Sequence, residues 1–282
     1  MESFWRPFEF EFFVNGLVAS TLAGALCGLV GTYIVLRSMS YIGHGLSHAI
    51  YGGFFAAGLA GVNVILGAGL WGFACALLIS RVSRTRGIGS DAAIGVITTA
   101  SFALGVALLK RYGSRGVDDP EALLFGQILG VDDADLARLG LVLVGTAALV
   151  FCCYRPLLFT TFDPEVAAAS GVRVGRMDAL LSLLLAATVL TTMHVLGVTL
   201  VAATVVIPPV AARMLTDSFG RMLGLSTALG AVCGSTGMVL SYHWDIPSGP
   251  MIVLVGAAMF GVVYALTGVR SRFPVGLSAG PD

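Results

Sequence analysis

Apolar residues in this 282-residue chain gather in long runs that short polar clusters separate. A helix needs about 20 residues to cross a hydrocarbon core of roughly 30 Å, and the runs have about that length. The pattern predicts an all-α fold, a bundle of eight or nine membrane-spanning helices, with residues 1–282 forming a single transmembrane domain. The second and third segments are short, so one of them could be broken or re-entrant. The expected segments are 14–37, 43–60, 62–81, 91–110, 134–155, 176–194, 195–214, 220–242 and 249–268.

Composition supports a membrane protein. Hydrophobic residues make up 57% of the chain and charged residues only 11%, whereas soluble domains carry about 25% charged residues. The first residues are acidic and aromatic rather than basic, so we expect no cleaved signal peptide and a first apolar run that remains as a span. The five cysteines contain no CxxC pair, and we expect them to pack among apolar residues rather than form disulfides or bind metal.

The distribution of charge predicts the orientation, because Arg and Lys remain mainly on the cytoplasmic side of a membrane. Nine spans with the carboxyl end inside place these residues on the cytoplasmic side: Arg37, Arg81, Arg84, Arg86, Arg155, Arg173, Arg176, Arg213, Arg221, Arg270 and Arg272. The same nine-span arrangement leaves five basic residues on the outside, namely Arg6, Lys110, Arg111, Arg115 and Arg138. The same orientation gathers acidic residues outside, either as a mouth that concentrates cations or as solvated loop ends. These are Glu9, Glu11, Asp118, Asp119, Glu121, Asp132, Asp133, Asp135 and Asp245.

Small residues recur four apart in two of the expected spans. Gly24 and Gly28 follow Ser20 at this spacing, and Gly230 and Gly234 repeat it. Such stripes allow helix backbones to approach closely. We expect them to pack inside the bundle, although one stripe could instead form the seam of a dimer.

Two adjacent prolines occur in VVIPPVAARML, in the middle of an expected span. Pro208 and Pro209 remove two backbone donors, so we expect the helix to bend or break there. A break at this depth could line a cavity, or the bend could serve packing only.

Two histidines lie four residues apart in SMSYIGHGLSHAIYGG, residues 38–53. On a helix, His44 and His48 fall about 40° apart on one face, so both imidazoles can bind one metal ion, as in soluble zinc motifs. Polar side chains inside a membrane are costly and commonly mark a transport pathway. The alternative is two neutral histidines that hydrogen-bond to their neighbours. The pattern lacks the glutamate of HExxH, which favours metal transit over hydrolysis.

The other two histidines are weaker metal candidates. His194 lies near the expected outer end of a span, and His243 lies beside Trp244 at an expected membrane interface. Histidines are common at interfaces, so both could be structural, and both could also form a secondary entry site for a metal.

A polar segment, TTFDPEVAAASGVRVGRMDAL, lies between two spans on the expected cytoplasmic side. Asp163 is a favourable N-cap, Pro164 suits the first helical turn, and Glu165 complements the helix dipole. Gly171 is suited to end the helix. The segment predicts a short cytoplasmic helix over residues 163–171, which is either a simple connector or a docking element for a soluble partner.

The chain contains no GxxxxGK[ST] pattern, the loop that cradles phosphates in many ATPases. We therefore expect a chain that is not itself an enzyme. ATP-driven transport would require a separate ATPase subunit.

Six ordered sequence blocks resemble the permease family of bacterial zinc, manganese and iron ABC importers. The resemblance runs from about residue 14 to residue 268. The blocks are MSYIGHGLSHAIYGG, DAAIGVITTASFALGVAL, LLFGQILGVDDADL, FDPEVAAASGV, LGVTLVAATVVIPPVAARMLT and DIPSGPMIVLVGAAMF.

This resemblance implies a multi-pass protein of the bacterial inner membrane that works as a pair, most simply a homodimer. It implies two cytoplasmic ATP-binding subunits, an extracytoplasmic metal-binding protein and no nucleic-acid partner. It also implies that FDPEVAAASGV is the coupling helix that docks into the ATPase. Many members have Asp at the position of His44. Imidazole suits zinc and carboxylate suits manganese, so the departure favours zinc over manganese as the transported ion, with no permanently bound cofactor.

We therefore expect the permease of an ATP-driven importer of a divalent metal, most simply zinc. A permease for a metal chelate or organic cofactor is one alternative, and it would not need the histidine pair. An ATPase-independent cation channel or carrier is another, and it would have no use for the cytoplasmic helix. A membrane-embedded metalloenzyme is a third, and the absent general base argues against it.

Overall fold

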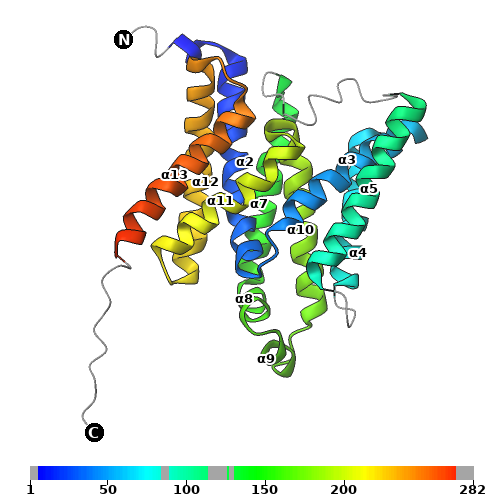
Figure 1. Cartoon of the computed structure of the whole chain (residues 1–282), viewed down its shortest axis with the longest axis vertical. Helices are drawn as coiled ribbons and strands as arrows, with labels where there is room; N and C mark the ends of the chain where they lie inside the picture. The colour runs from blue at the N-terminus through cyan, green and yellow to red at the C-terminus, as the bar shows by residue number, and fades with distance from the viewer. Residues whose placement is uncertain (1–5, 84–88, 114–125, 127–129, 271–282) are drawn as a thin grey trace.

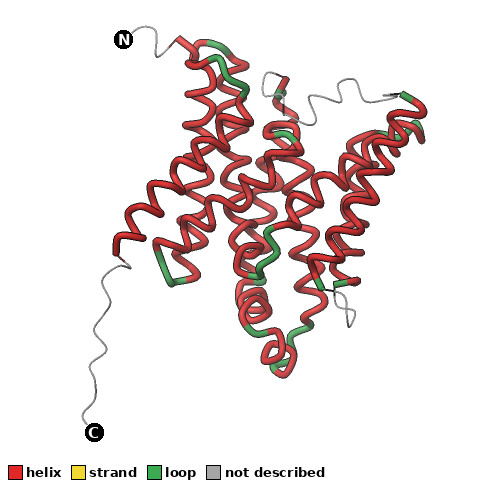
Figure 2. The backbone as a smooth tube through the Cα atoms, viewed as in Figure 1, coloured by secondary structure: helices red, strands yellow, loops and turns green. Residues whose placement is uncertain are grey.

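The computed structural model describes residues 6–83, 89–113, 126 and 130–270, and these ranges are helical with short connections (Figures 1 and 2). No strand occurs among the described residues, so the predicted all-α fold is confirmed. After the 3-10 turn η1 (Arg6–Glu9), the α-helices are α2 (Glu11–Leu36), α3 (Tyr41–Ala60), α4 (Val64–Val82), α5 (Ser90–Tyr112), α7 (Asp133–Cys152), α8 (Tyr154–Phe162), α9 (Pro164–Ala169), α10 (Val174–Leu196), α11 (Val198–Leu215), α12 (Phe219–Trp244) and α13 (Ser248–Arg270).

Eight of the described helices are long and apolar enough to cross a membrane: α2, α4, α5, α7, α10, α11, α12 and α13. The ninth expected span is α3, whose 20 residues include both histidines of the predicted pair. It packs against α4, α5, α10 and α11, inside the bundle rather than at its edge. Neither the second nor the third segment is broken, because α3 and α4 are each continuous.

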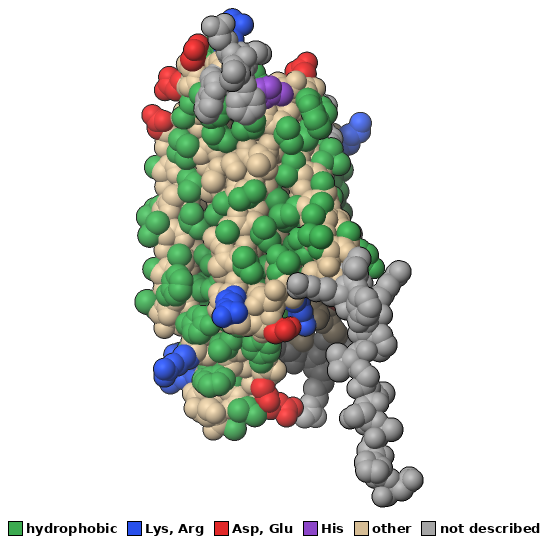
Figure 3. Space-filling view, turned by 90° about the vertical axis from the view of Figure 1, so that its left-hand side faces the viewer, with side chains coloured by type: hydrophobic (Ala, Val, Ile, Leu, Met, Phe, Trp, Pro, Cys, Tyr) green, Lys and Arg blue, Asp and Glu red, His purple; other side chains and the backbone are tan. Residues whose placement is uncertain are grey.

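Among the described residues, basic side chains are more numerous at the end of the bundle that carries α9, and both ends also carry acidic side chains (Figure 3). On the side that carries α9 lie Arg37, Arg81, Arg155, Arg173, Arg176, Arg213 and Arg221. On the opposite side lie Arg6, Glu9, Glu11, Lys110, Arg111, Asp132, Asp133, Asp135, Arg138 and Asp245. The α9 side is therefore assigned as cytoplasmic. The remaining predicted charges, at positions 84, 86, 115, 118, 119, 121 and 272, lie outside the described residues.

The two glycine stripes pack against each other, so the alternative of a dimer seam made by one of them is wrong. A methyl group at Gly24 would overlap the backbone carbonyl of Gly230, and one at Gly234 would overlap that of Ser20. The Ser226 hydroxyl donates to the Gly28 carbonyl at 2.6 Å. α2 and α12 can approach this closely only because these positions lack a Cβ.

Helix α11 continues through its two prolines, so the expected break is absent. Pro209 has no N–H, which leaves the Val205 carbonyl without its intrahelical donor. That carbonyl lies against Gly31 of α2, where a methyl group would overlap it. Glycine at position 31 therefore allows α2 to approach this carbonyl closely.

All five cysteines are free, and Cys27, Cys75 and Cys233 are buried, as predicted for packing residues. Cys152 is exposed and Cys153 is half-buried.

Candidate metal site and cytoplasmic helix

His44 and His48 lie in the first half of α3, one helical turn apart. Their ring centroids are 4.5 Å apart and their planes meet at 80°. Two imidazoles on one tetrahedral ion, with metal–nitrogen bonds of about 2.0–2.1 Å, would place their centroids about 5 Å apart. The observed spacing is therefore close to that of two imidazoles that share one ion.

The two rings have different surroundings. His44 is exposed on the surface of the chain, and His48 is half-buried against the ring of Phe102 on α5, with centroids 4.7 Å apart. The Nδ1 atom of His48 is buried and has no hydrogen-bond partner among the described residues. A buried ring nitrogen without a partner is costly, and a metal ion would satisfy it. The alternative of two histidines that hydrogen-bond to their neighbours does not hold for this atom.

Close packing of α3 against α5 holds the pair in place. The Ser101 hydroxyl donates to the carbonyl of Ala49, the residue after His48, at 2.9 Å. The indole N–H of Trp71 on α4 donates to the same hydroxyl at 2.7 Å. Gly52 and Gly105 allow the two backbones to touch, since a methyl group at either glycine would overlap α5 or α3. The histidine face is therefore built on rigid helices rather than on a loop.

The structure does not bring the other two histidines to this pair. His194, on α10, contacts the ring of Phe54, with centroids 5.8 Å apart. His243, at the outer end of α12, donates its Nδ1–H to the Val239 carbonyl at 2.8 Å and contacts Tyr242. Among the described residues, no three His, Cys, Asp or Glu side chains form a group that could hold a metal. The pair therefore stands apart from any third His, Cys, Asp or Glu side chain of the described residues that could complete a metal-binding group.

The predicted cytoplasmic helix is α9, and its local structure matches the sequence. The Asp163 carboxylate accepts from the Val166 N–H at 2.9 Å, and Pro164 occupies the first turn. Glu165 is exposed. The helix ends at Ala169, and Gly171 follows with a φ of +83°, a left-handed conformation that favours glycine.

Helix α9 forms the tip of the cytoplasmic side (Figure 1). Ala167 faces the protein and is fully buried. Three large apolar side chains around it are more than half exposed, namely Phe159 at 51%, Phe162 at 61% and Val166 at 53%. Exposed apolar side chains that gather at one place commonly mark a protein interface.

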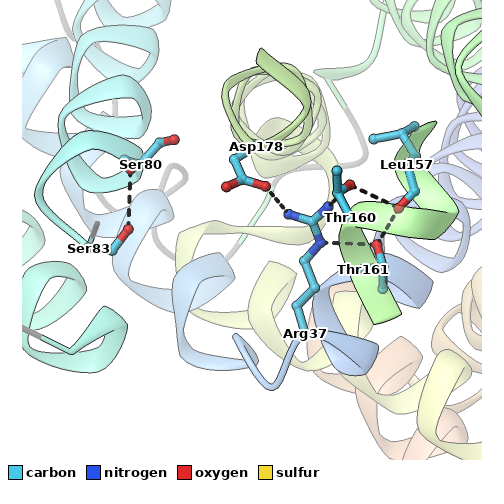
Figure 4. A network of polar contacts seen from close by, with 7 residues as sticks. All are labelled: Arg37, Ser80, Ser83, Leu157, Thr160, Thr161 and Asp178. Carbon is cyan, nitrogen blue, oxygen red and sulfur yellow. Dashed lines mark hydrogen bonds and ion pairs between the residues drawn. The ribbon is translucent and has the colours of Figure 1, made fainter. Parts of the chain in front are cut away.

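In the sequence, Arg37 served only as an indicator of orientation, but the structure places it in a polar network close to the start of α3 (Figure 4). Its guanidinium forms a salt bridge with Asp178 of α10 at 2.6 Å and hydrogen bonds to two threonines of α8. No short motif in the sequence signals this contact, because the partners are 123 to 141 residues away from Arg37.

Among the described residues, eight helices that can cross a membrane, the α3 helix with its histidine pair, and a short capped helix at one end of the bundle are typical of multi-pass transport subunits. The family described as the ABC 3 transport family matches residues 9–267. The chain therefore belongs to the ABC 3 transport family, and the predicted resemblance to metal ABC importer permeases is confirmed.

Individual relatives agree with this assignment. The manganese transport system membrane protein MntC of Halalkalibacterium halodurans is 35% identical over 269 residues, covering 94% of this chain and 91% of the relative. A protein of Haemophilus influenzae named "Probable iron transport system membrane protein" is 32% identical, covering 95% and 98%. The solved structure of PsaBC from Streptococcus pneumoniae in complex with Fab is 30% identical and superposes with a TM-score of 0.83, covering 93% of this chain and 95% of that one.

Proposed function

We propose that the chain is the permease through which an ATP-driven importer moves a divalent transition metal into a bacterial cell. The observation that carries the proposal is the His44–His48 pair, with a buried His48 nitrogen that has no partner among the described residues. Family membership supports metal import as the class of function. The names of the relatives refer to manganese and iron.

Zinc is the ion that we propose for this chain, because both side chains of the pair are imidazoles. Imidazole binds zinc well, whereas manganese prefers carboxylate and carbonyl oxygen. Two ligands per chain, rather than a closed set of four, suit an ion that must be released again. A second permease copy could bring its own pair to the same ion, and the exposure of His44 leaves it accessible for this.

The proposed transport cycle uses both ends of the chain. An extracytoplasmic metal-binding protein delivers the ion at the acidic outer side, and His44 and His48 hold it briefly within the membrane. Two cytoplasmic ATP-binding subunits dock at α9, where Phe159, Phe162 and Val166 supply exposed apolar surface. Closure of these subunits on ATP moves α9, and the ion is exposed to the cytoplasm.

The same features argue against the alternatives. A permease for a metal chelate or organic cofactor would have no need of two imidazoles that can share one ion. An ATPase-independent channel would have no need of a capped helix with exposed apolar residues beyond the membrane.

The test is uptake by the permease reconstituted in vesicles with its ATPase subunits and binding protein. Zinc, manganese and iron would be offered singly and in competition, with ATP inside the compartment that corresponds to the cytoplasm. We expect ATP-dependent uptake in which excess zinc suppresses entry of manganese and iron. Uptake of a chelate but not of bare ions, or uptake without ATP, would refute the proposal. Suppression of zinc entry by manganese would overturn the choice of zinc alone.

A further inference from the structure

We propose that Arg37 is a positioning residue that joins the coupling helix α9 to the histidine-bearing helix α3, so that movement of one repositions the other. This inference rests on the proposed function. It follows from a polar network on the cytoplasmic side that contacts three helices at once (Figure 4).

The Arg37 guanidinium binds three acceptors through three different nitrogens. Nη1 donates to the Asp178 carboxylate at 2.6 Å, Nη2 to the Thr160 hydroxyl oxygen at 2.9 Å, and Nε to the Thr161 hydroxyl oxygen at 3.1 Å. Only 10% of the Arg37 side chain is exposed. A planar guanidinium with this many bonds has a defined orientation, and a lysine ammonium could not reproduce it.

The threonines are themselves oriented. Both hydroxyls donate their hydrogen to the Leu157 carbonyl, at 3.1 Å from Thr160 and 2.7 Å from Thr161. Each hydroxyl oxygen therefore presents its lone pairs to the guanidinium. Asp163, the N-cap of α9, follows Thr161 by two residues. A displacement of α9 must therefore act on the acceptors of Arg37 almost directly.

On its other side, Arg37 is coupled to α3 by a very short connection. Arg37 is the C-cap of α2, and α3 begins at Tyr41, so His44 lies in the first turn and a half of α3. The connection is tight, because Ser38 has a left-handed φ of +56° and the Met39 N–H donates to the Ile34 carbonyl at 3.0 Å. Such a turn is stiff, since few alternative backbone conformations preserve its bonds.

A cavity beside the network provides room for movement. Its volume is about 160 Å³, and its lining includes Arg37, Asp178 and Ile42 of α3, together with serine side chains of α4, α5 and α10. The Arg37–Asp178 pair lies on the wall of this cavity, so the pair can shift without displacing close-packed apolar side chains.

The first measurement is the number of metal ions imported per ATP hydrolysed by the reconstituted complex. Arg37→Lys keeps the charge but loses the planar set of guanidinium N–H donors. Thr161→Val removes one acceptor at nearly constant volume. We expect each to lower the ratio roughly tenfold, as for the loss of a charge-assisted hydrogen bond, while assembly and Tm change little. Arg221→Lys, at an exposed arginine on the same side, is the matched control and should retain the ratio.

The second measurement detects movement of α3, whichever ion the protein transports. A spin label at Tyr41→Cys, a site that is 73% exposed, would be compared with and without trapped nucleotide, with Cys152 and Cys153 changed to serine. We expect the nucleotide to alter the label's spectrum with Arg37 present and to leave it unchanged in Arg37→Lys and Thr161→Val.

The two measurements separate this inference from the proposed function. If the wild type imports no metal but the label still responds to nucleotide through Arg37, the proposed cargo is wrong and the mechanical link stands. If the label responds equally in all variants, or if the ratio falls only as far as Tm falls, Arg37 has a structural role and the inference is overturned.

Discussion

The imidazole ring of His44 meets the ring of His48 edge to face, with centroids 4.5 Å apart on adjacent turns of α3. The His48 ring is held on its other side by Phe102, while the His44 ring is exposed at the surface of the chain. This arrangement gives the pair one enclosed and one exposed imidazole. A metal could reach the exposed ring first and then bind the enclosed one.

Replacing His48 by alanine should abolish metal uptake, because one ligand of a two-ligand site is lost. Assembly with the ATPase should survive, since His48 lies within α3 and far along the chain from α9. The measurement is radiolabelled zinc entry into vesicles containing the purified complex. His243→Ala is the matched control, because His243 is bonded to its own helix at the outer end of α12 and should leave uptake nearly unchanged. Normal zinc entry in His48→Ala would remove the pair from the mechanism.

Replacing His44 by aspartate should shift the metal preference from zinc toward manganese. A carboxylate in place of one imidazole supplies the harder oxygen ligand that manganese prefers. The measurement is the ratio of manganese to zinc uptake at equal concentrations, which should rise by roughly tenfold or more, the effect of about 1.4 kcal/mol of changed binding preference. A ratio that stays constant would show that selectivity is set elsewhere.

External acidification should reduce uptake, because a metal ligand must be a neutral imidazole and protons compete with the ion for it. Metal binding is therefore strongest at mildly alkaline pH and weakens as the pH falls. The His44→Asp variant is a useful comparison, because a free carboxylate titrates near pH 3.9. In mildly acid solution, protons then compete with the metal only at the one remaining imidazole. Uptake that is flat from mildly alkaline to mildly acid pH would contradict a histidine site.

Replacing Glu165 by arginine should uncouple ATP hydrolysis from transport. Glu165 is exposed in the first turn of α9, where a negative charge favours the helix dipole and a positive one opposes it. The measurement is metal imported per ATP, with ATP hydrolysis itself retained. Asp217→Arg makes the same charge change at an exposed residue of the α11–α12 connection on the same side. Equal coupling in the two variants would refute a docking role for α9.

Substituting Gly230 by valine should prevent the correct packing of α2 against α12. Even a methyl group at Gly230 would overlap the Gly24 carbonyl, and overpacking costs about 1–3 kcal/mol or more. The measurement is the Tm of the purified chain in detergent, which should fall sharply or be replaced by aggregation. Gly145→Val is the control, because nothing lies within 4 Å of a Cβ at Gly145. Similar Tm values for both variants would contradict the glycine seam.

Much of the fold follows from local rules that the sequence displays directly. The apolar runs predicted the helices because a bilayer requires every backbone group to be bonded within its own helix. The cap at Asp163 and the left-handed Gly171 were predicted from residue chemistry within a few positions along the chain. The His44–His48 spacing was predicted because helical geometry alone places residues four apart on one face.

Other features needed the packed structure because they depend on residues far apart in sequence. Two equal glycine stripes could have met each other or a second copy, and only the tertiary structure shows that they pack together as the α2–α12 seam. The two prolines of α11 were expected to bend or break the helix, but α11 continues through them, with its Val205 carbonyl packed against Gly31.

The sequence by itself thus determined the class of fold, the apolar stretch and polar ends of each helix, and the two imidazoles that can bind one ion. The tertiary structure decided which helices touch, and it placed the Arg37 guanidinium between α8 and α10 beside the start of α3. The physical reason is the distance along the chain between the groups that interact. Helix formation and capping depend on neighbours within one or two turns, whereas close packing and buried ion pairs depend on groups that meet only when the chain has folded.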